Sequence, residues 1–109
     1  MSPAIRSLVV NVSDLDAAKS VYGALLGTPH TDRPYYVGYN VGGFEVSLAP
    51  GDPTGGPVAY VDVEDLDAAR ETLLAAGATE RTAPTQVAPE ARVCVLADAD
   101  GNPIGLRGK

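Results

Sequence analysis

Glu45 is the residue whose type and surroundings best suit acid–base chemistry. It lies in a run where Phe44, Val46 and Leu48 alternate with polar residues, a pattern typical of a strand with one apolar face. A carboxylate placed beside an apolar wall can act as a general acid or base. A glutamate at a wet strand rim has no such role. Both interpretations of Glu45 stay open at this stage.

The single histidine and the single cysteine are the other reactive side chains. His30 stands between Pro29 and Thr31 in a polar stretch, where it is either solvated or catalytic. Cys94 has apolar neighbours and no adjacent base, which favours packing over nucleophilic chemistry. One cysteine cannot form an internal disulfide or a thiolate metal cluster.

A duplicated segment organises the elements that position these residues. The stretch VNVSDLDAAK at residues 10–19 recurs 51 residues later as VDVEDLDAAR, with seven of ten positions identical. Two copies are too few for a solenoid, so they favour one pseudo-symmetric domain. The repeated aspartates follow a strand and precede an apolar helical pattern, which predicts helix caps rather than catalysts.

The first copy predicts a strand over residues 5–12 and a helix that is capped at Ser13 or Asp14 and ends before Gly27. A polar loop over residues 28–34 follows. Strands are predicted over residues 35–41 and 44–49, joined by a turn at Gly42 and Gly43. Residues 50–57, rich in Pro and Gly, form the linker between the copies.

The second copy predicts the same order. A strand covers residues 58–63 and a helix covers residues 65–76. Residues 79–82 form a short edge strand, and residues 83–90, with two prolines, form a loop or irregular edge. Strands over residues 92–97 and 104–107 flank a turn at residues 98–102. Each copy is thus a strand, a helix and two or three further strands.

Composition limits the classes of partner. The chain is 45% apolar and has a net charge of −6, so we expect one globular domain over residues 1–109 and no nucleic-acid partner. No signal peptide and no run long enough to span a membrane is evident. A cytoplasmic protein without a membrane partner is the expectation.

This pattern, with VxDLxAA after each first strand and Asp98-Ala-Asp-Gly-Asn102 before the last, resembles the vicinal oxygen chelate superfamily. That group includes glyoxalase I, extradiol dioxygenases, bleomycin-resistance proteins and methylmalonyl-CoA epimerase. The resemblance covers residues 5–107 and implies an α+β fold of two βαβββ modules that form an open, curved, cup-like sheet, often in a homodimer. The first module would span residues 4–49 and the second residues 58–108.

The resemblance also indicates where a metal would sit. The superfamily's metal enzymes take ligands from the first and last strands of each module, at positions that hold Ser7, Ser47, Val58 and Gly105 in this chain. Zinc, nickel or iron(II) needs several imidazoles, thiolates or carboxylates around one ion. These four residues cannot supply them, so we expect no metal at that site and no cofactor.

A small-molecule pocket remains, because an aromatic-walled cup with a few polar groups is the usual way to build one. The strand phase places polar and aromatic residues of both modules on the inner face. The predicted ligand-binding residues are Asn11, Tyr35, Tyr39, Glu45, Tyr60, Asp62 and Arg107. Either face of the tyrosine-rich strand could point inward. In the second alternative, the inward residues are Tyr36, Gly38 and Asn40. Arg92 or Cys94 joins the set if its strand has the matching phase.

The favoured function is metal-independent binding of a small aromatic or cationic molecule, as in the bleomycin-resistance branch, where a drug is sequestered. The alternative is a glyoxalase-like lyase or isomerase, or a dioxygenase-type enzyme, with a non-standard site in which Glu45 is the base. A dimerising accessory domain without a ligand is a third possibility. The sequence does not identify the ligand.

Overall fold

The computed structural model describes residues 4–109, and two βαβββ runs follow one another along them. The first run is β1 (Ala4–Val12), α1 (Leu15–Leu26), β2 (Thr31–Arg33), β3 (Tyr36–Val41) and β4 (Phe44–Pro50). A short 3-10 turn, η1 (Pro53–Gly55), precedes the second run. That run is β5 (Val58–Asp62), α2 (Leu66–Ala75), β6 (Thr79–Ala88), β7 (Ala91–Ala97) and β8 (Pro103–Gly108). The α+β class and the two βαβββ modules are therefore confirmed.

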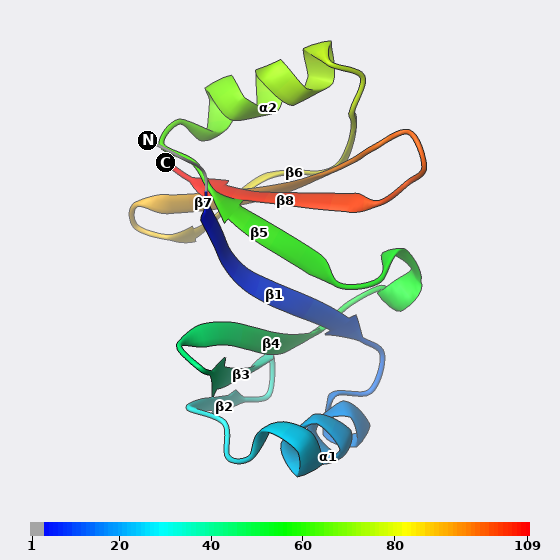
Figure 1. Ribbon diagram of the computed structural model, residues 1–109, viewed down its shortest axis with the longest axis vertical. Helices are drawn as coiled ribbons and strands as arrows, with labels where there is room; N and C mark the ends of the chain where they lie inside the picture. Colours follow the sequence, from blue (N-terminus) through cyan, green and yellow to red (C-terminus); the bar gives the residue numbers. More distant parts are fainter. Residues whose placement is uncertain (1–3) are drawn as a thin grey trace. The chain divides into compact units, whose positions relative to one another are not determined.

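The chain divides into two compact units (Figure 1). The N-unit contains residues 7–58, and the C-unit contains residues 4–6 and 59–109 of the described chain. Strand order is β2-β3-β4-β1 in the N-unit and β5-β8-β7-β6 in the C-unit. The pairs β1–β4 and β5–β8 are parallel, and the other pairs within each unit are antiparallel. The joining of the modules into one cup stays a prediction.

Both helices begin where the repeated aspartates predict. The Asp14 carboxylate accepts a hydrogen bond from the Ala17 amide at 3.1 Å, and Asp65 accepts one from Ala68 at 3.0 Å. Each side chain thereby satisfies an amide that has no partner within its helix. α1 ends at Gly27, whose φ of 90° is readily adopted only by glycine. The repeat is an architectural signal.

Each unit has its own core beneath its own helix (Figure 1). In the N-unit, Val37, Tyr39 and Leu48 are buried with α1 and Val10 packed against them. In the C-unit, a buried cluster packs against α2, and its members are Leu66, Cys94, Leu96 and Leu106. The apolar face of each first strand therefore packs against its own helix, as its alternation predicts.

Two predicted loops contain strands. Residues 28–34 include β2, which pairs with β3. β6 continues to Ala88 through the predicted irregular stretch 83–90. An edge strand tolerates proline because one row of its amides needs no partner. The β6–β7 pairing also shifts register at three places, and the shift between Thr82 and Thr85 contains Pro84.

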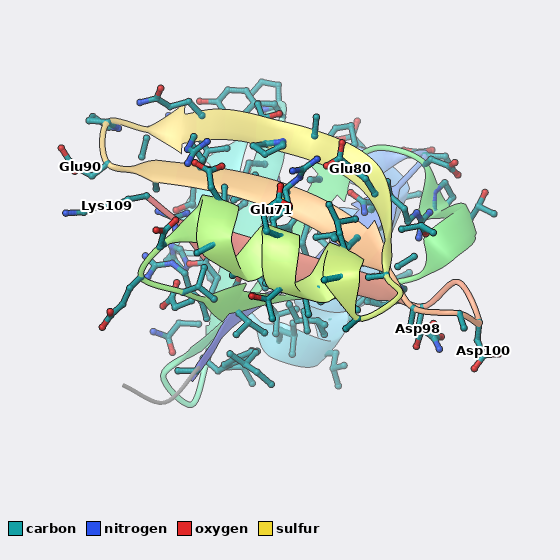
Figure 2. The ribbon with its side chains drawn as sticks, turned by 90° about the horizontal axis from the view of Figure 1, so that it is seen from above. Glu71, Glu80, Glu90, Asp98, Asp100 and Lys109 are labelled. Carbon is teal, nitrogen blue, oxygen red and sulfur yellow. The ribbon has the colours of Figure 1, made fainter. Side chains whose placement is uncertain are left out.

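Different charged side chains lie at the two ends of the C-unit (Figure 2). At one end, the predicted turn is closed by Asp98, which accepts hydrogen bonds from the Asp100 and Asn102 amides at 3.0 and 2.9 Å. Hydrogen bonds from Asn102 hold the pKa of Asp98 below its usual range. Glu90 and Lys109 lie at the opposite end (Figure 2).

Neither helix within residues 4–109 is both long and apolar enough to cross a membrane.

Candidate functional site

The N-unit sheet has one face packed against α1 and one helix-free face. Neighbours in register lie on the same face of a sheet. Val10 and Leu48 pack against α1. Ser7 pairs with Glu45, and Gly38 pairs with Ser47. These two pairs alternate along their strands with Val10 and Leu48, so they lie on the other face. The helix-free face therefore carries these residues, all of them polar except Gly38: Ser7, Asn11, Tyr36, Gly38, Asn40, Glu45 and Ser47.

Four side chains on this face form one polar group, which we call the Glu45 cluster: Thr31, His30, Glu45 and Tyr36. Tyr36 Oη donates to Glu45 Oε2, and His30 Nε2 lies 3.3 Å from Glu45 Oε1. On the other side of the imidazole, Thr31 Oγ1 lies 2.8 Å from His30 Nδ1. The side chains of His30 and Glu45 are 42% and 38% exposed, so the cluster is accessible to a ligand.

Gly38 makes room for this arrangement. A Cβ on Gly38 would lie 3.0 Å from His30 Cε1 and 3.1 Å from the Tyr36 ring. The backbone also holds His30 here, because its amide donates to the Gly38 carbonyl at 2.9 Å. The neighbouring Ser47 is fully buried, and within residues 4–109 its hydroxyl has no hydrogen-bond partner.

Gly38→Ala is expected to move the His30 ring and to lower the free energy of unfolding by about 1–3 kcal/mol, since the added methyl overpacks the site. Gly23→Ala is the matched control. A Cβ there meets only Tyr39 Oη at 3.6 Å, and alanine in a helix gains about 0.5–1 kcal/mol over glycine. Urea denaturation of both variants, with the His30 proton signals in NMR, measures the contrast. Equal changes in both variants would contradict it.

The cluster can accept a cation or a proton. In one tautomer, Nδ1 accepts a hydrogen bond from the Thr31 hydroxyl, and the protonated Nε2 lies 3.3 Å from Glu45 Oε1. Glu45 thus accepts the Tyr36 hydroxyl at one oxygen and has the imidazole close to the other. A carboxylate in such a network binds a positively charged or hydrogen-bond-donating group, and the imidazole beside it can carry a proton.

The superfamily's metal positions do not suit a metal. Ser7 and Ser47 are on the helix-free face of the N-unit, while Val58 and Gly105 are buried. Over residues 4–109, no three His, Cys, Asp or Glu side chains are placed to hold one ion. His30 and Glu45 offer only two such ligands, and a buried hydroxyl is a poor third.

The structure resolves the phase of the tyrosine-rich strand. Tyr39 is 1% exposed in the core beneath α1, so its placement on the inner face is corrected. Tyr35 precedes β3 and is 70% exposed. The second phase, with Tyr36 and Asn40, is the one that shares a face with Glu45. The error arose because tyrosine occurs in both phases of this strand.

The other predicted residues lie in different places. Asn11 is on the helix-free face of the N-unit beside Gly51. In the C-unit, Tyr60 pairs with Gly105 and Asp62 with Arg107, so all four share its helix-free face. Burial raises the pKa of the Tyr60 phenol.

Arg92 and Cys94 lie on the other face of the C-unit sheet, the face that packs against α2. Arg92 Nη2 pairs with Asp67 Oδ2 at 2.9 Å and, through that hydrogen bond, lowers the pKa of the carboxyl. Cys94 is fully buried in the C-unit core, and burial raises its pKa. The predicted packing role of the cysteine is confirmed, and a high pKa keeps a thiol unreactive.

The sequence did not indicate that His30 and Tyr36 would meet at Glu45. Their meeting depends on β2, which has three residues and therefore no periodicity to detect. The available signal was local: Pro34, a turn former, separates Thr31–Arg33 from the tyrosine-rich strand, as in a hairpin connection.

The comparisons with known proteins agree with this fold. A family model described as a glyoxalase-like domain matches residues 7–106. The chain belongs to the glyoxalase-like family. A search of curated proteins finds no match, so the family statement rests on the family model. The resemblance seen in the sequence is confirmed.

Several solved structures share the glyoxalase-like fold. A glyoxalase/bleomycin resistance protein/dioxygenase superfamily member from Vibrio splendidus 12B01 has 14% identity and a TM-score of 0.70 over 98% of each chain. Methylmalonyl-CoA epimerase from Mycobacterium tuberculosis has 22% identity and a TM-score of 0.65 over 95% of this chain and 86% of its own. An NAD-dependent benzaldehyde dehydrogenase structure from Legionella pneumophila has 16% identity and a TM-score of 0.72, covering 93% and 96%. At these identities the likeness is one of fold.

Proposed function

We propose that this glyoxalase-like protein binds a small cationic or aromatic molecule at the Glu45 cluster without a metal, in the manner of a drug-sequestering bleomycin-resistance protein. One observation carries the proposal: the metal positions of the fold hold Ser7, Ser47, Val58 and Gly105, while a carboxylate, an imidazole and a phenol gather on the N-unit face that carries Ser7 and Ser47. The set can hold a cation but cannot form the usual metal centre.

Two features support a cationic ligand. Glu45 is in contact with no arginine or lysine within the described chain, so its charge is available to a ligand. Tyr36 adds an aromatic surface next to that charge, and aromatic faces attract cations. A ligand ammonium or guanidinium would replace His30 at Oε1 while Tyr36 keeps its hydrogen bond to Oε2.

The alternative is a glyoxalase-like enzyme with a non-standard site, and the His30–Glu45 contact favours it. Glu45 could act as the base that takes a proton from a bound substrate, with the His30 ring 3.3 Å from its carboxylate. Binding and catalysis share the same residues in these two hypotheses. A bound ligand recovered unchanged supports sequestration, whereas a ligand recovered in altered form supports the enzyme.

The test is a panel of cationic aromatic compounds, with metal-free bleomycin among them, titrated into chelator-treated protein. We expect at least one to raise the melting temperature in a saturable manner and to change tyrosine fluorescence, because ligand bound to the folded state stabilises it. Neutral analogues of the same size serve as controls. Unchanged melting curves across the panel would contradict the proposal. A homodimer, a role in antibiotic resistance and a cytoplasmic location remain proposals that accompany it.

A further inference from the structure

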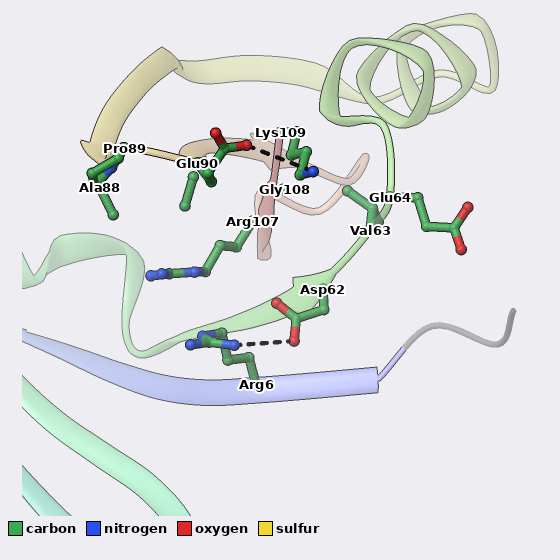
Figure 3. A pocket seen from close by; sticks show the side chains of 11 residues that line it. Arg6, Asp62, Val63, Glu64, Ala88, Pro89, Glu90, Arg107, Gly108 and Lys109 are labelled. Carbon is green, nitrogen blue, oxygen red and sulfur yellow. Dashed lines mark hydrogen bonds and ion pairs between the residues drawn. The ribbon is translucent and has the colours of Figure 1, made fainter.

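A second polar site lies in the C-unit, where a hollow of about 630 Å³ opens between the ends of β5 and β8 and the β6–β7 turn (Figure 3). It is separate in sequence from the Glu45 cluster. Arg6, Arg107 and Lys109 provide its cations, and Asp62, Glu64 and Glu90 provide its acids. The position of each charge decides what the hollow can bind.

Arg107 is the cation without a counterion. It is half-buried, and no carboxylate of residues 4–109 pairs with it. Its guanidinium and that of Arg6 extend to the same side of the hollow, as Figure 3 shows. Because Asp62 pairs with Arg6, one positive charge remains without a counterion on this side of the hollow, and an anion would neutralise it.

The existing ion pairs in the hollow are long and solvent-exposed. Arg6 lies 3.4 Å from Asp62, with side chains 50% and 44% exposed, and Lys109 lies 3.6 Å from Glu90. A charge-assisted hydrogen bond is about 2.7–2.9 Å long, and an exposed pair contributes about 0–1 kcal/mol. An incoming anion could therefore take Arg6 from Asp62 at small cost.

The remaining acids do not occupy the space between the arginines. Glu64 extends away from both guanidinium groups, and Glu90 extends toward Lys109 (Figure 3). Asp62 is thus the only acid in the hollow that competes for the arginines within the described chain.

We propose that Arg107 and Arg6 form a binding site for the anionic group of a small molecule, a carboxylate or a phosphate. The guanidinium fork matches the oxygens of either group in a two-point geometry. Arg107 supplies the resident charge, and Arg6 exchanges its Asp62 partner for the anion. This site is independent of the Glu45 cluster, so each proposal can fail without the other.

The experiment titrates inorganic phosphate, and separately malonate, into the protein at constant ionic strength set with sodium chloride, followed by the amide and arginine side-chain signals in NMR. We expect saturable shifts of the Arg107 and Arg6 signals. Arg107→Gln should weaken binding tenfold or more, while Arg81→Gln, an exposed arginine outside the hollow, should change it less than twofold. Tighter phosphate binding identifies a phosphate site, and tighter malonate binding a carboxylate site.

Asp62→Asn is expected to strengthen anion binding, whereas Arg107→Gln weakens it. Removal of the competing carboxylate frees Arg6, so phosphate or malonate should bind at least threefold more tightly than to the wild type. Asp100→Asn, in the turn at the other end of the C-unit (Figure 2), makes the same change of net charge and should alter affinity less than twofold. Absence of saturable binding to both probes, or equal losses in Arg107→Gln and Arg81→Gln, would overturn the proposal.

Discussion

Glu45→Gln is expected to weaken binding of the cationic ligand about 10- to 100-fold, which is the effect of losing a hydrogen bond to a charged group, about 1.5–3 kcal/mol. Glutamine keeps the shape of the side chain and can still accept the Tyr36 hydroxyl. The change therefore removes the charge while the packing stays. Titration calorimetry with the best compound of the panel measures the loss.

Two controls separate this effect from a general one. Glu71→Gln removes the same charge from α2, on a side chain that is 73% exposed, and should leave affinity within twofold. A neutral analogue of the ligand should bind wild type and Glu45→Gln alike. Equal affinity of both proteins for the cationic compound would exclude Glu45 from the binding site.

Leu66→Ala is expected to lower the free energy of unfolding by about 2–5 kcal/mol, the usual loss for a large-to-small change in a core. Leu66 is fully buried at the start of α2 and belongs to the C-unit cluster with Cys94, Leu96 and Leu106. Truncation leaves a cavity in the only core that holds α2 to the strands of its unit within residues 4–109.

Leu25→Ala is the matched control, since Leu25 lies on α1 and is 78% exposed. Surface substitutions of this kind change stability by about 0.5 kcal/mol or less. Urea denaturation followed by circular dichroism compares the two variants under the same conditions. A loss in Leu25→Ala as large as that in Leu66→Ala would mean that the exposed face of α1 is covered in solution.

The fold was accessible from the sequence because it rests on repeated, periodic signals. Val10 and Val61 occupy the same place in the two copies, and each packs beneath the helix that its own copy encodes. The alternation around them determined the strand phase and hence the positions of Ser7 and Ser47. Such signals extend over many residues and outweigh local ambiguity.

The candidate site was less accessible because it depends on short-range geometry. Glu45 was singled out by its alternation, but its partners come from a three-residue strand and from a run where tyrosines occur in both phases. The absence of a side chain at Gly38 lets His30 lie against the sheet, and no periodic pattern encodes that contact. The hollow near Arg107 likewise depends on Arg6, which is distant in the sequence.

The most direct test of metal-independent binding at the Glu45 cluster is a ligand titration of the same protein in chelator and in excess manganese, zinc or nickel. We expect the cationic compound to bind chelator-treated protein with an affinity that each metal changes less than twofold, and to perturb the NMR signals of Tyr36 and His30. Binding that appears only after a metal is added would contradict the account.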